Sequence, residues 1–348
     1  MVVKILERGF TFDDVLIVPS ESAMEPAEAS LKMTLCGIEL SVPFLSAAMD
    51  RVTESAMAIA LGKLGGLGVL HRNCSVPEQA AMVKQVKKAG VPVAAACGPF
   101  AADRAKALDE ALCDVIVIDC AHGHNLNVVA SAKSIKKNLK HAKMIFGNIA
   151  TAEAAKEACA FADAIKVGVG PGSICTTRII SGVGVPQLSA ILDVVSVASK
   201  KNVPVVADGG MRTSGDIAKA LAAGASAVML GNIFAGTDEA PGKIVEKGGK
   251  KFKEYRGMGS KSVIEGAAGR ERYFTHGRKA VPEGVEALVP YKGPVSDMVA
   301  TLVSGVQVGM GYAGARNLKE FHKKAKFIRI TNASIAEGKP HSLSSLTE

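Results

Sequence analysis

One cysteine of the chain stands in a glycine-rich stretch that has the composition of a loop. The stretch reads Gly170-Pro-Gly-Ser-Ile-Cys-Thr-Thr-Arg178, and its cysteine is Cys175. The thiolate is the reactive form of cysteine, and backbone N–H groups or a nearby arginine lower the pKa of a thiol. A loop cysteine taken alone is more often incidental, but this composition favours a nucleophile. The carbonyl oxygens of the glycines could also surround a cation.

A second candidate site combines an acid, two glycines and a helix start. Asp208-Gly-Gly210 follows an apolar run, Ser214-Gly-Asp216 opens a helical pattern, and the next apolar run ends in Gly231-Asn232. Unbonded N–H groups at a helix N-terminus attract anions, and glycines let a phosphate approach the backbone. A purely structural turn is the alternative. If a phosphate binds there, Asp208 would accept hydrogen bonds from a ribose, and the ligand would be a nucleotide or a sugar phosphate.

Metal and disulfide chemistry find little support in the sequence. His122 and His124 lie two apart without a companion carboxylate–histidine motif, which favours hydrogen bonding in a loop over metal binding. Asp119, just before them, is better placed to contact a ligand. The seven cysteines include no Cys-x-x-Cys pair, which excludes the usual zinc spacing and argues against a disulfide framework.

Composition narrows the class of protein. The chain has 348 residues, of which 48% are hydrophobic and 22% charged, as in a soluble globular protein. No apolar run reaches the length needed to span a bilayer, and the first residues lack the features of a signal peptide, so we expect a cytoplasmic protein that does not enter the membrane. The net charge of +9 permits an anionic partner, but the absence of tryptophan and the 4% aromatic content argue against binding nucleic acid by base stacking.

The elements that must position these residues follow a regular alternation. Short apolar runs alternate with helical patterns such as Val76–Ala89, Ala101–Leu112 and Ser214–Ala223, which predicts parallel βαβ units. The predicted strands are Pro43–Ala47, Gly66–Leu70, Val91–Ala95, Val115–Asp119, Lys143–Gly147, Ala164–Gly168, Val203–Ala207 and Ala227–Gly231. Eight such units close a (β/α)8 TIM barrel. An open doubly wound sheet is the alternative, but it would want a Gly-x-Gly-x-x-Gly turn after an early strand, which the sequence lacks.

Two connections are longer than a barrel requires. Val169–Gln187 and Thr237–Pro294 both follow predicted strands, so both should lie at the C-terminal face of the barrel, where barrel active sites occur. We therefore expect one catalytic domain over residues 1–348, with a long active-site loop, a mobile flap at about 243–294 and a polar tail at 331–348. The basic cluster Lys243–Arg256 is expected to form a loop or a hairpin, and a last helix and strand are expected at Asn317–Ala325 and Phe327–Ile330.

Taken together, these loops resemble those of one enzyme family, the inosine-5′-monophosphate (IMP) dehydrogenases and guanosine-5′-monophosphate (GMP) reductases. The resemblance covers nearly the whole chain. The motifs that carry it are Gly170–Arg178, Asp208-Gly-Gly210, Tyr255-Arg-Gly-Met-Gly-Ser260, Ser46-Ala-Ala-Met-Asp50, Gly147-Asn148 and Gly182-Val-Gly-Val-Pro-Gln187.

The resemblance implies a role for individual residues. Cys175 would attack C2 of the purine, and Asp208 would hold the ribose hydroxyls. The phosphate would be surrounded by Ser173, Gly209, Gly210, Gly231, Asn232 and Tyr255, and the base would be contacted by Gly257, Met258, Gly259 and Glu283. The cofactor NAD would lie against Asp119, Asn148 and Gly168. A potassium ion would be bound by carbonyl oxygens of Gly170, Gly172 and Cys175 together with Glu337, Gly338 and Lys339 of a neighbouring subunit in a homotetramer. The chain departs from the family pattern at Asn232, where serine or glycine is usual, and at Lys339, where glycine is usual.

The two activities of the family diverge after the cysteine has attacked the purine. A dehydrogenase must hydrolyse a covalent thioimidate, and in the family a flap supplies an Arg–Tyr pair for this step. Arg272 and Tyr273 stand at the matching place before Val281-Pro-Glu-Gly284. Arginine is an unusual base because its pKa in water lies above 12, so only a closed, water-poor pocket could tune it. Thr177 with Glu283 would form a second proton relay that both activities share.

The sequence therefore favours an NAD-dependent IMP dehydrogenase that forms xanthosine monophosphate in guanine nucleotide biosynthesis. GMP reductase is the alternative, because Lys88-Ala-Gly90 runs directly into the third predicted strand and leaves no room for the regulatory cystathionine-β-synthase-type repeats that dehydrogenases usually carry there. A remote alternative is a non-enzymatic nucleotide or nucleic-acid binding protein, suggested by the charge of +9.

Overall fold

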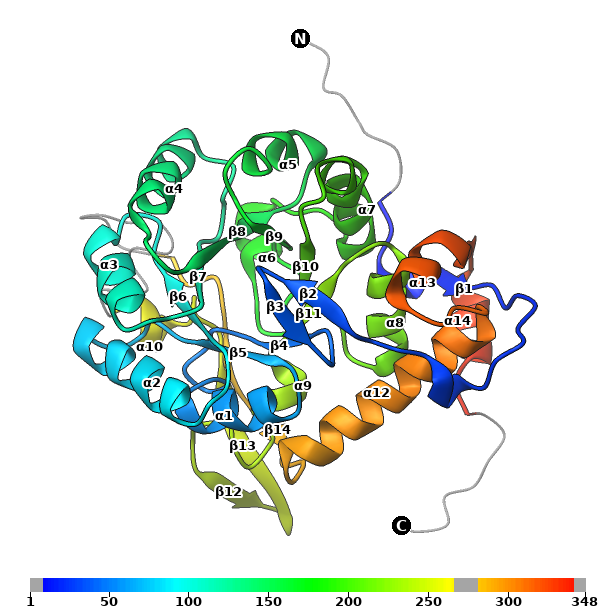
Figure 1. Cartoon of the computed structure of the whole chain (residues 1–348). Coiled ribbons are helices and arrows are strands. Elements are labelled where there is room, and N and C mark those ends of the chain that lie inside the picture. Colours follow the sequence, from blue (N-terminus) through cyan, green and yellow to red (C-terminus); the bar gives the residue numbers. More distant parts are fainter. Residues whose placement is uncertain (1–8, 266–280, 341–348) are drawn as a thin grey trace.

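The computed structural model describes residues 9–265 and 281–340 of the chain, and its centre is a closed barrel of parallel strands surrounded by helices (Figure 1). The strands run around the barrel in the order β10-β11-β4-β5-β6-β7-β8-β9. Their bounds are β4 (Phe44–Ser46), β5 (Leu67–Leu70), β6 (Val93–Cys97), β7 (Val115–Asp119), β8 (Lys143–Ile149), β9 (Ala164–Val167), β10 (Val205–Asp208) and β11 (Ala227–Leu230). The predicted (β/α)8 barrel is confirmed, and each predicted strand agrees with the observed one within two residues at either end.

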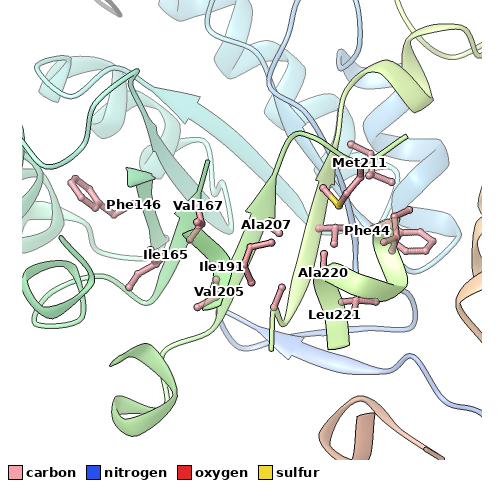
Figure 2. Packing of buried hydrophobic residues seen from close by; sticks show 14 of the residues in the cluster. Phe44, Phe146, Ile165, Val167, Ile191, Val205, Ala207, Met211, Ala220 and Leu221 are labelled. Atoms are coloured by element: carbon pink, nitrogen blue, oxygen red, sulfur yellow. The ribbon is translucent and has the colours of Figure 1, made fainter. Parts of the chain in front are cut away.

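The strands are continuous apolar runs because both of their faces are covered. Inward residues such as Val206 fill the barrel, while outward residues such as Val205 and Ala207 pack against the helices. Figure 2 shows this outer layer, in which Ile165, Val167, Val205 and Ala207 lie with Ile191 of α7 and Leu221 of α8. The surrounding helices are α1 (Ser55–Lys63), α2 (Val76–Lys88), α3 (Ala102–Glu110), α4 (Leu126–Asn138), α5 (Ala152–Ala158), α7 (Gln187–Ala198), α8 (Ser214–Ala222) and α12 (Val295–Tyr312).

Local signals set the ends of these helices. In α2, the Ser75 hydroxyl accepts from the Glu78 N–H and the Glu78 carboxylate accepts from the Ser75 N–H, which forms a capping box. The Thr213 hydroxyl accepts from the Asp216 N–H and begins α8 directly after the Asp208–Gly210 turn. Helix starts of this kind fix where each loop ends, and the loops carry the site.

A hairpin closes the N-terminal end of the barrel. Its strands are β2 (Met33–Leu35) and β3 (Ile38–Leu40), and Figure 1 shows them across the opening of the barrel. Leu35 and Leu40 are buried in one cluster with the first residues of several barrel strands, among them Leu67, Val115 and Ala227. Apolar side chains therefore fill the barrel interior from its N-terminal end up to the level of the polar side chains at the C-terminal ends of the strands.

The remaining elements extend the barrel at its rim. β1 (Val15–Ile17) pairs antiparallel with β15 (Phe327–Arg329), and α13 (Leu318–Lys324) precedes β15 as predicted. The basic cluster forms the predicted hairpin, with β12 (Ile244–Lys247) and β13 (Lys250–Arg256), and β14 (Glu286–Pro290) adds a third strand to it. Among the described residues, the short α-helices that were not predicted are α6 (Thr177–Ser181), α9 (Asn232–Ala235), α10 (Lys261–Ile264) and α14 (Asn332–Glu337), the last within the segment expected as a polar tail. None of the helices in the described part of the chain has both the length and the apolar character needed to cross a bilayer.

Candidate active site

A pocket opens at the C-terminal ends of the barrel strands, opposite the closing hairpin. It brings together every predicted substrate, cofactor and nucleophile residue in the described part of the chain. These are Asp119, Asn148, Gly168, Gly170, Gly172, Ser173, Cys175, Thr177, Asp208, Gly209, Gly210, Gly231, Asn232, Tyr255, Gly257, Met258, Gly259 and Glu283. Arg272 and Tyr273 lie outside the described residues.

Cys175 begins a chain of hydrogen bonds that ends at a carboxylate. Its Sγ donates to Thr177 Oγ1 over 3.1 Å, and Thr177 Oγ1 donates to Glu283 Oε2 over 2.7 Å. The backbone holds these partners together: the Thr176 N–H donates to the Glu283 carbonyl and the Val285 N–H to the Ile174 carbonyl. This arrangement gives a thiol proton a path to an acceptor, as nucleophilic catalysis by cysteine requires.

Arg178 braces the loop that carries Cys175. Its Nη2 donates to the Val185 carbonyl over 2.6 Å and, like its Nε, to the Val169 carbonyl over 3.3 Å. These contacts join the start of the loop to its end. Burial lowers the pKa of Arg178, while the negative charge of an ionised Cys175 would act in the opposite direction.

Four polar residues from neighbouring strands form the floor of the pocket. Lys166 Nζ donates to Asp119 Oδ1 over 3.0 Å, to Asp208 Oδ2 over 2.6 Å and to Asn148 Oδ1. Sequence reasoning missed Lys166, although a lysine inside the apolar run Ala164–Val167 is a signal, because a buried charge needs partners. The cluster places the predicted ribose acid and the predicted cofactor acid around one ammonium group.

A buried tyrosine lies at the predicted phosphate end of the pocket. Burial raises the pKa of Tyr255 to about 12, although a hydrogen bond from Ser173 opposes the shift. Its hydroxyl therefore stays protonated near neutral pH and can donate to an anion. A Cβ at Gly231 would lie 2.9 Å from the Tyr255 hydroxyl, so a larger residue there would displace it.

An ion pair ties the rim sheet to the barrel beside the predicted base site. Arg256, at the end of β13, donates through Nε to both oxygens of Asp50 over 3.1 Å and through Nη2 to Oδ2. Asn73 Nδ2 donates to the same carboxylate over 2.7 Å. Burial alone would raise the pKa of Asp50, but Arg256 and Asn73 hold it below its ordinary value. The ion pair fixes the loop that begins at Gly257. The sequence motifs that contain Asp50 and Arg256 did not by themselves indicate that the two side chains meet.

The two histidines do not form a metal site with other residues of the described chain. The rings of His122 and His124 lie edge to face, with centroids 6.5 Å apart, and His124 Nε2 lies 4.0 Å from Glu157 Oε2. Burial lowers the pKa of His122. Within residues 9–265 and 281–340, no group of three histidine, cysteine, aspartate or glutamate side chains is arranged to hold a metal ion.

Glu337, Gly338 and Lys339 do not line the pocket of their own chain. α14 ends at Glu337, and Lys339 lies near enough to Asp13 to lower the pKa of that carboxyl, to which Arg212 contributes most. The prediction assigns these three residues to the site of a neighbouring subunit, and it stays a prediction.

Comparison with known proteins gives the family. The family model for the IMP dehydrogenase / GMP reductase domain matches residues 9–341. The chain is 41% identical to an inosine-5′-monophosphate dehydrogenase of Methanocaldococcus jannaschii, covering 97% of the chain and 96% of the relative. It is 40% identical to the enzyme of that name from Borreliella burgdorferi and 42% identical to that from Cryptosporidium parvum, with at least 98% of each chain covered. The alignments extend over 474, 402 and 393 positions respectively, so these relatives contain segments that this chain lacks. The chain belongs to the IMP dehydrogenase / GMP reductase family.

Proposed function

We propose that the protein is an IMP dehydrogenase, which oxidises inosine 5′-monophosphate to xanthosine 5′-monophosphate with NAD⁺. The observation that carries the proposal is the chain from Cys175 through Thr177 to Glu283, which faces the same pocket as Asp208 and Tyr255. Cys175 would act as the nucleophile, Asp208 would accept hydrogen bonds from the ribose hydroxyls, and Tyr255 would donate a hydrogen bond to the phosphate. A nucleoside monophosphate substrate requires all three functions. The three relatives compared above all carry the dehydrogenase name.

The first half of the reaction uses the nucleophile. Cys175 Sγ forms a bond to C2 of the purine, its proton passes to the Thr177 hydroxyl and onward to Glu283, and the hydride at C2 leaves. Bound NAD⁺ supplies the acceptor for that hydride. Asp119, Asn148 and Gly168 would hold the dinucleotide, and their place in the same pocket fits this role because two ligands must meet face to face there.

The second half returns the enzyme to its free state. Water adds its oxygen to C2 of the thioimidate and the C–S bond breaks. One proton of the water restores the Cys175 thiol, and the other stays on the ring nitrogen of the purine that was doubly bonded to C2. Arg272 and Tyr273 are proposed to activate this water from the flap. The Thr177–Glu283 pair is assigned to the first half of the reaction, where it receives the thiol proton. Splitting the reaction in two lowers the barrier of each part.

A potassium ion is proposed at the loop that carries Cys175. The Cys175 N–H donates to the Gly172 carbonyl over 3.1 Å, which closes a turn and gathers the backbone of Gly170, Gly172 and Cys175. Neutral carbonyl oxygens suit a monovalent cation, so the residues present fit the group. Because the remaining ligands would come from another chain, the proposal includes a homotetramer.

The domain organisation is proposed to be one catalytic barrel, with a flap at about 243–294, and without the regulatory repeats. α2 ends at Lys88 and β6 begins at Val93, so the connection at the expected insertion point is short. A protein without that module should lack control through it. Assays with added GTP or ATP should therefore leave the rate unchanged at low nucleotide concentration, and strong inhibition there would contradict the proposal.

The deciding experiment is a paired assay in potassium-containing buffer. One cuvette holds IMP and NAD⁺, the other holds GMP and NADPH, and the absorbance of the reduced nicotinamide is followed in both. Rising absorbance in the first, with xanthosine monophosphate recovered, is expected. Falling absorbance in the second alone would identify the reductase, the second candidate, which the shared cysteine loop and the short connection after α2 also permit.

A further inference from the structure

We propose that Lys166 is a positioning residue that fixes the substrate acid Asp208 and the cofactor acid Asp119 with one ammonium group and thereby couples the two binding sites. The inference rests on the proposed function for the ligand that each acid faces. The contacts among these residues are independent of it.

The alternation of β9 directs Lys166 into the barrel. Its outward neighbours Ile165 and Val167 belong to the outer core, whereas Ala164, two residues earlier, packs inside the barrel. The side chain of Lys166 is 2% exposed. Burying an ammonium group in a barrel core is costly unless partners replace its water.

The number of hydrogen-bond acceptors around Lys166 equals the number of N–H donors that its ammonium group offers. An ammonium group has three donors, and here they reach Asp119 Oδ1, Asp208 Oδ2 and Asn148 Oδ1. The three acceptors come from β7, β10 and β8, so strands on both sides of β9 are joined through one atom. Lys166 therefore has no donor left for a ligand and acts through its partners.

The arrangement prepares Asp208 for a diol. Its Oδ2 accepts from Lys166 over 2.6 Å and from Asn148 Nδ2 over 2.9 Å. Asn148 Nδ2 also donates to the Gly168 carbonyl over 2.7 Å, so the nitrogen and the oxygen of the Asn148 side-chain amide both have hydrogen-bond partners. Within residues 9–265 and 281–340, Asp208 Oδ1 has no hydrogen-bond donor, and it can accept from ribose hydroxyls.

Removing the charge of Lys166 should therefore have a distinctive effect. Two carboxylates would remain around the same buried space, and mutual repulsion would favour protonation of one of them. The other titratable groups near the cluster are Cys120, beside Lys166, and Tyr255, whose hydroxyl senses the charge of Asp208. Arg72 donates to the Asp119 backbone carbonyl over 3.4 Å and is the further cation that faces the cluster.

The test begins with Lys166→Met, which keeps the length of the side chain and removes its charge. We expect the KM values for IMP and for NAD⁺ both to rise by about 10- to 100-fold, the range that charged hydrogen bonds give. We also expect kcat/KM to acquire a new ionisation and to recover as the pH is raised. Lys156→Met, on the exposed face of α5, is the matched control and should leave both KM values unchanged.

Two further variants separate positioning from packing. In Lys166→Ala, ethylammonium should restore part of the lost activity, whereas ethanol at the same concentration should not. In Lys166→Met combined with Asp119→Asn, one charge of each sign is removed, so IMP affinity should recover through an ionised Asp208 while the KM for NAD⁺ stays raised. This double variant also keeps the test decisive if the single variants fold poorly.

Three outcomes would overturn the inference: KM values within twofold of wild type in Lys166→Met, equal rescue by ethylammonium and ethanol, or no recovery of IMP affinity in the double variant. A wild-type protein that fails to oxidise IMP would instead overturn the proposed function. Calorimetric titration of IMP into wild type and Lys166→Met would then still test whether Lys166 prepares Asp208 for a nucleotide.

Discussion

The proposed nucleophile of the pocket is Cys175, and this role separates substrate binding from chemistry. Its Sγ contacts Thr177, whereas Asp208, Gly231 and Tyr255, which are predicted around the ribose and the phosphate, are held by other elements. Cys175→Ala should therefore bind IMP with an affinity close to that of wild type and produce no NADH. Calorimetry and nicotinamide absorbance check the two halves, and Cys159→Ala, remote from the pocket, is the control.

The two proposed bases act at different steps, and their variants should stall differently. Arg272→Ala should release NADH in a first burst of one equivalent and then stop, because water is no longer activated. Thr177→Val interrupts the path from Cys175 to Glu283 and should slow the burst itself, by roughly 100-fold for a lost proton relay. Rapid quenching and mass spectrometry of the intact protein would detect the adduct. A full burst in Thr177→Val would remove the relay from the first step.

Individual site residues could be predicted from the sequence only where they belong to a recognisable motif. Cys175 stands in a glycine-rich loop and Asp208 at the end of β10, directly before two glycines, and both line the pocket. Lys166 was missed because one lysine in an apolar run carries no spacing signal. The pairing of Asp50 with Arg256 joins residues 206 positions apart, and only the three-dimensional fold brings them together.

At the scale of elements, one carboxylate joins the end of α3 to the loop after α4. Asp109 accepts from the backbone N–H groups of Lys140, His141 and Ala142 over 2.7 to 3.0 Å. Burial alone would raise the pKa of Asp109, but these N–H groups lower it below its ordinary 3.8. The carboxylate therefore stabilises the fold above about pH 3.8, and this contribution is lost as the pH falls through the lowered pKa.

Asp109→Asn should accordingly reduce the free energy of unfolding at pH 7 by about 1–3 kcal/mol, because the amide offers one acceptor to three donors. The difference from wild type should shrink as the pH approaches and passes below 4. Urea unfolding at a series of pH values measures it. A difference that stays constant with pH would mean that packing, and not the charge, is what Asp109 contributes.

The elements themselves were predictable to different degrees for a physical reason. Barrel strands are buried on both faces, so each is a short apolar run, and α2 begins at a capping box that the sequence spells out. The sheet of β12, β13 and β14 lies at the rim and has mostly exposed residues, so no apolar alternation marked it. The helix α6 has five residues, too few to show a period.

At the scale of the whole molecule, the hairpin at the N-terminal end is part of the barrel core. Leu40 is buried in the inner cluster together with the first residues of several barrel strands, and it does not itself line the pocket. Leu40→Ala should lower the free energy of unfolding by about 2–5 kcal/mol and leave the KM for IMP unchanged. Leu16→Ala, at an exposed position, should change stability little. Urea denaturation and steady-state kinetics measure the two effects, and a raised KM in Leu40→Ala would show that the two ends of the barrel are coupled.

The same hairpin also limits how ligands can enter and leave the pocket. Since side chains fill the barrel axis at the end that the hairpin covers, ligands reach the pocket from the C-terminal face of the barrel. In the proposed reaction, the nucleotide and the dinucleotide would both use this entrance. In the proposed cycle, the flap would enter the pocket after the reduced dinucleotide has left through this entrance and before the product is released.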